Sequence, residues 1–277
     1  MVKKILFQTI FRIPLVIWAI VVIYPILWIF LGAFKQYGEI FRSPWALPES
    51  WEFGNFLAAW TEYNIGSSFF NSLLVTALGA LLCLFFALPT AYAIVRIRFR
   101  GSNILFNIYL ASMMIPMVLA WIPLFFLLRD LNLIDNLFAL ALIYSVTQVP
   151  FTVFILASFL QSVPRDLEEA AAIDGMSMYG VLFKIVAPLV KTGIITATIM
   201  NAVMFWNEYF MALIFLQTDE KNTLGVTMDL MNQNAEYTNS WGALFAGLAI
   251  AVVPIMIIYA VFQRQITKGM TEGALKG

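Results

Sequence analysis

One carboxylate, Glu208, lies well inside an apolar run and is the first candidate for chemistry in this sequence. A charge at the centre of a membrane costs about 2.5–3.5 kcal/mol on insertion scales, so such a residue normally faces protein or water. Its neighbourhood adds amide and aromatic groups, which can hydrogen-bond to and stack on sugars: Asn201, Trp206, Asn207 and Tyr209. Two interpretations stay open: the cluster lines the path of a polar solute, or it is a buried hydrogen-bonded network that fixes helix packing.

The residue types needed for most enzyme chemistry are missing. Histidine is absent, which removes histidine metal sites, Ser/His nucleophilic pairs and histidine proton relays. The single cysteine, Cys83, excludes an intrachain disulfide and a cysteine metal cluster. The chain also has no G-x-x-x-x-G-K-[ST] motif, so it cannot hydrolyse ATP by the P-loop route. We therefore predict no catalytic residue, no metal site and no cofactor in this chain.

A second concentration of polar residues, segment 164–188, lies between two long apolar runs. Pro164 suits the first position of a helix, where its missing N–H would be unpaired anyway. Negative charge at the positive end of that helix comes from Asp166, Glu168 and Glu169. Gly175 can end the helix in the left-handed conformation, and Ser177 can cap a second helix, Met178 to Val186. The segment is therefore predicted to form a helix, a tight turn and a second helix.

One face of the first predicted helix is small and weakly apolar. Four residues fall three or four positions apart on it: Leu167, Ala170, Ala171 and Asp174. Side chains at this spacing share a helix face, and such a face suits a groove on a partner protein.

The composition indicates that membrane-spanning helices position these residues. Hydrophobic residues make up 62% of the chain and charged residues 12%, against about 25% charged in soluble domains. The mean hydropathy is +0.87. Because each span needs about 20 apolar residues, the 277 residues have room for several spans but not for a large soluble domain as well. The predicted fold is an all-α membrane protein, a single domain over 1–277, with six transmembrane helices at about 13–34, 69–95, 104–128, 137–160, 188–215 and 241–262 and a connecting loop at 161–187.

The placement of basic residues sets the orientation of these spans. With a cytoplasmic N-terminus, twelve of the sixteen Lys and Arg residues fall in cytoplasmic segments and four fall outside. The positive-inside rule then puts both termini and loop 161–187 in the cytoplasm. The net charge is zero, which gives no reason to expect a nucleic-acid partner.

Segment 164–188 also resembles a known motif. Glu169-Ala170-Ala171, then Gly175, Ile185 and Pro188, are similar to the EAA motif of the permease subunits of ATP-binding-cassette (ABC) importers. In that family this loop faces the cytoplasm and docks into a cleft on the ATPase subunit. The resemblance assigns ATPase coupling to these residues: Glu169, Ala170, Ala171, Asp174, Gly175 and Met176.

The resemblance extends over nearly the whole chain and points to the carbohydrate-importing, maltose-type branch. It rests on Asn71-Ser72, AYAIVRIRFRG, MMIP followed by Pro123, SVPRDLEEAAAIDG, FWNEYFMALIF and the ending GMTEGALKG. After Thr223-Leu224 the family often continues with proline, whereas this chain has Gly225, which bears only on the local turn.

The resemblance implies a type I importer permease (MetI-like) fold in the plasma or inner membrane. It implies a non-catalytic subunit that passes a sugar, expected to be an oligosaccharide, into the cytoplasm by alternating access. The implied partners are a second, different permease, two ATPase subunits that bind ATP and Mg, an extracytoplasmic solute-binding protein and membrane lipid. The alternative from another class is a secondary transporter that uses Glu208 as a proton site.

Overall fold

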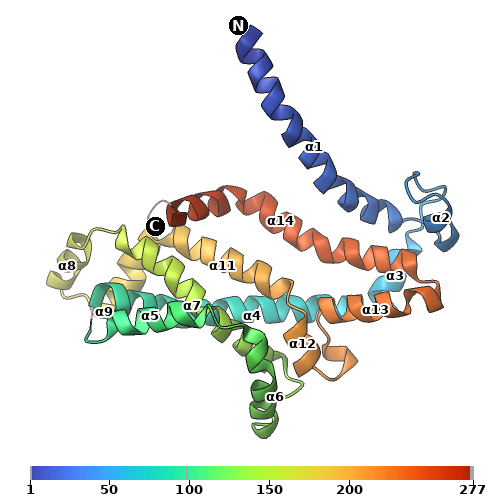
Figure 1. Cartoon of the computed structure of the whole chain (residues 1–277). Helices are drawn as coiled ribbons and strands as arrows, with labels where there is room; N and C mark the ends of the chain where they lie inside the picture. The colour runs from blue at the N-terminus through green and yellow to red at the C-terminus, as the bar shows by residue number, and fades with distance from the viewer. Residues whose placement is uncertain (1, 98, 275–277) are drawn as a thin grey trace. The chain divides into compact units, whose positions relative to one another are not determined.

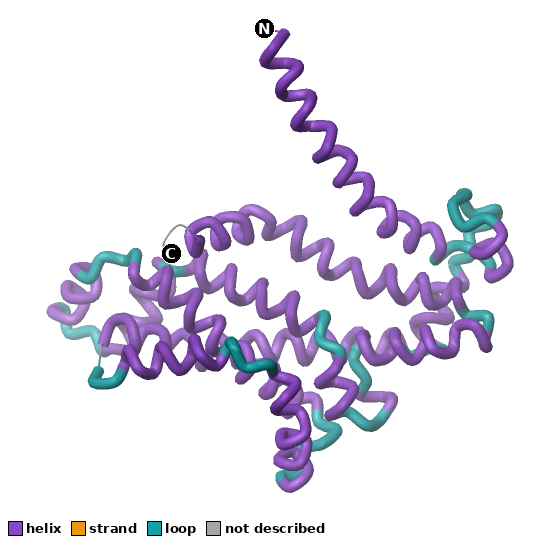
Figure 2. Tube along the Cα trace, in the orientation of Figure 1, coloured by secondary structure: helices purple, strands orange, loops and turns teal. Residues whose placement is uncertain are grey.

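The computed structural model describes residues 2–97 and 99–274. Within these ranges every regular element is a helix, as Figure 2 shows, which confirms the predicted all-α fold. Arg98 and Lys276, which contribute to the predicted topology, lie outside the described residues.

Most of the α-helices are labelled in Figure 1. In chain order they are α1 (Val2–Gly32), α2 (Tyr37–Arg42), α3 (Gly54–Thr61), α4 (Ile65–Tyr92), the π-helix η1 (Ala93–Ile97), α5 (Ser102–Ser112), the 3₁₀ helix η2 (Met117–Ala120), α6 (Trp121–Asp130), α7 (Leu137–Gln161), α8 (Asp166–Ile173), α9 (Met178–Gly180), the π-helix η3 (Val181–Val186), α10 (Ala187–Leu189), α11 (Lys191–Trp206), α12 (Phe210–Phe215), the 3₁₀ helix η4 (Asp219–Lys221), α13 (Leu224–Thr238) and α14 (Trp241–Ala274).

Among the described residues, four helical stretches are long and apolar enough to cross a membrane: Arg12–Gly32, Ile65–Ile97, Leu137–Gln161 and Trp241–Gln265. Two bent pairs also qualify when each is counted as one span, which brings the number to as many as six. They are Ser102–Ser112 with Met117–Asp130 and Met178–Leu189 with Lys191–Trp206.

The third predicted span, 104–128, is broken rather than continuous. The two helices of this pair are bent by 95° at the break, where Pro116 is extended, with φ −61° and ψ 121°. Proline lacks a backbone N–H and disfavours helix in the residue before it, so α5 ends short of Pro116.

The fifth predicted span, 188–215, is also broken, at residues 207–209 between α11 and α12. The reason lies in Glu208, whose carboxylate accepts hydrogen bonds from the backbone N–H groups of Met211 (2.8 Å) and Ala212 (3.2 Å). A side chain that occupies these donors starts a new helix instead of continuing the old one.

Two compact units make up the chain, Met1–Ser67 with Thr227–Pro254 and Ser68–Val226 with Ile255–Gly277. In the first unit, the Lys35 side chain is buried and its ammonium group donates to the carbonyls of Ser43 (2.7 Å) and Pro44 (3.2 Å). The Trp28 ring packs edge-on against Phe245 with centroids 4.9 Å apart. The single permease domain over 1–277 stays a prediction.

The second unit contains the segment and the cluster singled out above, and its core forms around α4, α7 and α11. Asn201 of α11 is buried and donates to the hydroxyl of Thr152 on α7 at 2.9 Å. Gly193 lets the same two helices approach closely, since a Cβ atom there would lie 2.5 Å from Phe159 Cγ.

We expect Gly193→Ala to destabilise this unit, because Phe159 must move and overpacking costs about 1–3 kcal/mol, which exceeds the roughly 1 kcal/mol gained in helix propensity. Gly54→Ala is the matched control, since nothing lies within 4 Å of its added Cβ. The measurement is the thermal unfolding midpoint of the purified protein. Equal midpoints for the two variants would contradict the close α7–α11 packing.

Candidate functional site

Segment 164–188 forms the predicted helix–turn–helix, with a different start. The helix α8 begins at Asp166 rather than Pro164, because the first carbonyl to accept helical hydrogen bonds is that of Arg165, from the N–H groups of Glu168 (2.9 Å) and Glu169 (3.1 Å). Three acidic residues occupy its first turn, as predicted. They favour the positive end of the helix dipole.

The predicted left-handed glycine at the end of α8 is confirmed. Gly175 has φ +78°, its N–H donates to the Ala172 carbonyl, and the N–H of Met176 donates to the Ala171 carbonyl, both at 3.0 Å. This pair of bonds is a Schellman motif, a compact helix ending that satisfies otherwise orphaned carbonyls. A Cβ atom added at Gly175 would have nothing within 4 Å. Glycine is therefore required at this position for its backbone conformation and not for lack of space.

The second helix of the segment begins as predicted and then changes type. The Ser177 hydroxyl accepts a hydrogen bond from the Gly180 N–H at 3.2 Å, which makes Ser177 the cap of α9. From Val181 to Val186 the helix is a π-helix rather than an α-helix. Such segments are rare and frequently mark functional sites.

The predicted coupling residues do not all face outward. Glu169, Ala170, Asp174 and Gly175 are exposed, Met176 is half-buried, and Ala171 is buried in the core beside it. The predicted face of Leu167, Ala170, Ala171 and Asp174 therefore needs correction at Ala171, which packs against the chain itself.

Large apolar side chains are exposed on segment 164–188, and sequence reasoning singled out only Leu167 among them. Ile173 is 86% exposed, Tyr179 68% and Met178 50%, together with Leu167 at 46%. Exposed apolar patches of this kind mark interaction sites. The available signal was an isoleucine at the end of a short helix whose first turn carries three acidic residues.

A buried ion pair ties α8 to the helices before it. Arg96 Nε in η1 lies 2.8 Å from Glu168 Oε1, with the two side chains 7% and 12% exposed. The Tyr92 hydroxyl donates to Glu168 Oε2 at 3.0 Å. Another guanidinium nitrogen of Arg96 donates to the carbonyls of Leu160 (2.8 Å) and Val163 (2.6 Å), at the end of α7. We call these five residues the Arg96 latch.

Sequence reasoning missed the Arg96 latch. Arg96 entered the prediction only as a basic residue for topology, and Glu168 only as a favourable charge in the first turn. Sequence spacing gives no sign that residues 72 positions apart form an ion pair, although both lie in motifs that carry the family resemblance.

The Glu208 cluster is partly a packing network. Besides the two backbone N–H groups of α12, the Glu208 carboxylate accepts a hydrogen bond from the Tyr144 hydroxyl of α7. Asn201 and Trp206 are buried, Tyr209 is half-buried and Asn207 is exposed. The structure thus brings Glu208 to Tyr144, and Asn201 to Thr152.

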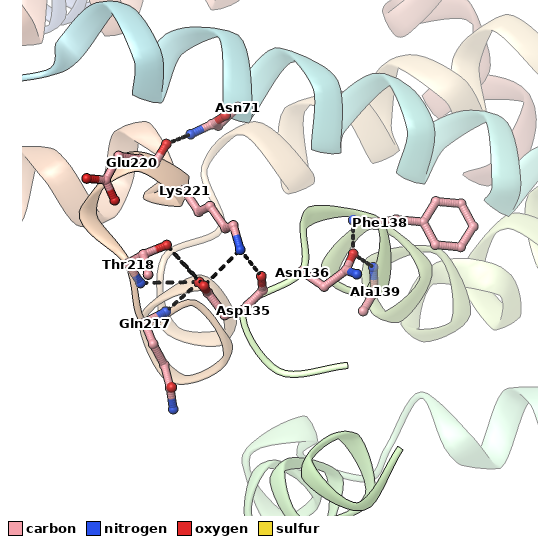
Figure 3. A network of polar contacts seen from close by, with 9 residues as sticks. All are labelled: Asn71, Asp135, Asn136, Phe138, Ala139, Gln217, Thr218, Glu220 and Lys221. Atoms are coloured by element: carbon pink, nitrogen blue, oxygen red, sulfur yellow. Dashed lines mark hydrogen bonds and ion pairs between the residues drawn. The ribbon is translucent and has the colours of Figure 1, made fainter. Parts of the chain in front are cut away.

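Figure 3 shows a polar network at the opposite end of α7 from α8. The Asp135 carboxylate accepts hydrogen bonds from the backbone N–H groups of Gln217 (3.0 Å) and Thr218 (3.2 Å) and pairs with Lys221 Nζ at 2.9 Å. Asn71 of α4 donates to the carbonyl of Glu220 at 2.8 Å. No pattern in the sequence indicates this pairing of two loops, which we call the Asp135 staple.

Hydrogen bonds and an ion pair stabilise the charged form of the Asp135 carboxylate. Partial burial acts to raise the pKa of Asp135, but the hydrogen bonds from Lys221, Gln217 and Thr218 outweigh it and lower the pKa from 3.8 to about 2. A lowered pKa means that the carboxylate stabilises the fold above pH 3.8 and that this contribution is lost as the pH falls through about 2.

Comparison with known proteins places this chain among transport components. Residues 79–272 match the family described as binding-protein-dependent transport system inner membrane component. The diacetylchitobiose uptake system permease protein NgcG of Streptomyces coelicolor is 35% identical, over 95% of this chain and 87% of that protein. The arabinooligosaccharides transport system permease protein AraQ of Bacillus subtilis is 32% identical, over 92% and 91%.

A solved structure has the same fold. A chain of a bacterial ABC transporter involved in the import of the acidic polysaccharide alginate superimposes with a TM-score of 0.81 at 27% identity. The match covers 94% of this chain and 96% of that chain.

The Asp135 staple yields a prediction on pH. We expect the amides of Gln217 and Thr218 to keep the same protection from hydrogen exchange between about pH 5 and 8, after correction for the intrinsic rate, and to lose it towards pH 2. Asp135→Ala should lose it at every pH, because Asp135 Oδ1, the acceptor of both amides, is gone. Protection in the wild type that falls already between pH 7 and 5 would contradict the lowered pKa.

Proposed function

We infer that this chain, which belongs to the family of binding-protein-dependent transport system inner membrane components, is the membrane-spanning permease of an ABC importer that carries an oligosaccharide into the cytoplasm. The transporters named for its relatives take diacetylchitobiose and arabinooligosaccharides, and the superimposed structure belongs to an alginate importer. The shared chemistry is a chain of sugar units, and we propose that class for this protein.

Segment 164–188 carries the proposal. It presents a short capped helix with exposed acidic and apolar side chains, while its inner face is fastened to the core through Ala171 and the Arg96 latch. An exposed apolar patch on a rigid support suits docking to a protein. We propose that the partner is the ATPase and that Glu169, Ala170, Asp174 and Gly175 contact it.

The proposed complex contains this chain, a second and different permease, two ATPase subunits that bind ATP and Mg, and an extracytoplasmic solute-binding protein. ATP hydrolysis takes place in the ATPase subunits, and this chain is not catalytic. Both termini and segment 164–188 lie in the cytoplasm, in keeping with twelve of the sixteen Lys and Arg residues on that side. ATP-driven closure of the ATPases moves α8 and switches the spans between inward-open and outward-open states.

The secondary-transporter alternative is not supported. The relatives and the superimposed structure are components of binding-protein-dependent and ABC uptake systems. Glu208, its proposed proton site, already accepts hydrogen bonds from Met211, Ala212 and Tyr144, which gives it a structural role.

The first test is co-purification of the ATPase with Glu169→Lys. The substitution reverses the charge of an exposed side chain, so we expect the protein to fold normally and the ATPase to be lost. Asp130→Lys is the matched control, since Asp130 is an exposed acid in α6, outside segment 164–188. Undiminished ATPase binding by Glu169→Lys would contradict the assignment of Glu169.

The second test uses the backbone conformation of Gly175. Gly175→Val should abolish uptake while leaving membrane insertion intact, because a β-branched residue opposes φ +78°. Gly175→Asn should retain most uptake, because asparagine tolerates the left-handed conformation. The measurement is accumulation of labelled diacetylchitobiose and arabinooligosaccharide in cells that express the complete transporter. Wild-type uptake by Gly175→Val would refute the need for this turn.

A further inference from the structure

Two adjacent acids of α8 have opposite environments. Glu169 is exposed, whereas the Glu168 side chain is 12% exposed and bonded to Arg96 and Tyr92. The exposed acid is available to a partner, and the buried acid is committed to the chain's own core. Substitution of Glu169 therefore tests binding to the partner, and substitution of Glu168 tests how a movement of the bound α8 reaches the other helices.

Arg96 contacts three parts of the second unit at once. It lies in η1, directly after α4, and its guanidinium reaches the end of α7 through Leu160 and Val163 and the first turn of α8 through Glu168. A planar group with several fixed donors can hold such an arrangement, and lysine, with a single flexible ammonium group, cannot reproduce it. A further bond ties the same region, from Arg165 to the Val95 carbonyl at 3.4 Å.

The charges of the Arg96 latch also suit the helices they join. The cationic guanidinium lies at the negative C-terminal end of α7, and the Glu168 carboxylate lies at the positive N-terminal end of α8. Because both charges are buried, removal of either leaves the other without its partner. The loop that joins α7 to α8, residues 162–165, is thus bridged by an electrostatic link that also holds the Val163 carbonyl inside the loop.

We propose that the Arg96 latch is the transmission element of this permease: Arg96 and Glu168 are positioning residues that make α8 move together with α4 and α7. This rests on the proposed docking of α8 to an ATPase. With the Arg96 latch intact, a displacement of α8 is passed to the spans. Without it, α8 still binds the ATPase, but its movement is absorbed by the flanking loops.

The test measures whether ATP changes the spans of the assembled transporter. The reporter is Asn207→Cys, an exposed position beside the break between α11 and α12, in a Cys83→Ser background. Its rate of reaction with a water-soluble maleimide is measured with and without ATP and vanadate. We expect the wild-type rate to change about fivefold or more. Fivefold is the lower end of the range by which two coupled sites usually change each other's affinity.

Glu168→Gln and Arg96→Lys are expected to keep the ATPase bound and hydrolysing ATP while the reporter's response falls to less than about twofold, below the range typical of coupled sites. Glu169→Gln, the neighbouring acid, should instead weaken ATPase binding. A purely structural role predicts reduced folded protein with a normal response in what remains. A wild-type response in Glu168→Gln would overturn the proposal.

Two further outcomes separate a failure of the transmission role from a failure of the proposed function and from a loss of folded protein. If the wild-type chain holds no ATPase, the proposed function fails, and with it the transmission role. If Glu168→Gln does not accumulate, Arg96→Lys decides, because it keeps a positive charge beside Glu168 and removes the fixed donors to Leu160 and Val163. A reduced response in Arg96→Lys with the ATPase bound supports the proposal, and an unchanged response overturns it.

Discussion

The buried ion pair between Arg96 and Glu168 is the interaction on which this account of the structure depends. It joins a span, the end of a second span and an exposed helix through one guanidinium group, with both side chains largely out of solvent. Buried ion pairs contribute little net stability compared with apolar packing. Their value here lies in geometry, because a fixed set of donors holds α8 at one position and orientation.

Polar side chains also satisfy the backbone at two interruptions of helices in the second unit. Glu208 caps α12, and Asp135 takes the N–H groups of the loop before η4. Backbone groups in an apolar surrounding must find partners within the protein. Glu208, the initial candidate for solute binding or proton transfer, is therefore one of the polar residues placed where a helix is interrupted.

The sequence predicted the helices and the turn of segment 164–188 well, because their signals are local. Gly175 and Ser177 act through their own backbone and nearest turns, and apolar runs identify spans by length. The sequence did not predict interactions between distant segments. Spacing alone could not show that Ala171 turns inward, that Arg96 pairs with Glu168 or that Asp135 binds the loop before η4. The predicted fifth span also ran through Glu208, because the hydropathy of the surrounding residues gives no sign that this carboxylate starts a new helix.

The most direct test of the central claim is a distance between α8 and α7 through the transport cycle. Spin labels at Ala172 and Val146, two exposed positions on these helices, would report it in the assembled transporter, with Cys83 replaced by serine. If α8 and the spans move as one body, the distance distribution is the same in the nucleotide-free and ATP-trapped states. A shift between those states beyond the width of the nucleotide-free distribution would show that α8 moves independently of α7 and would contradict the account.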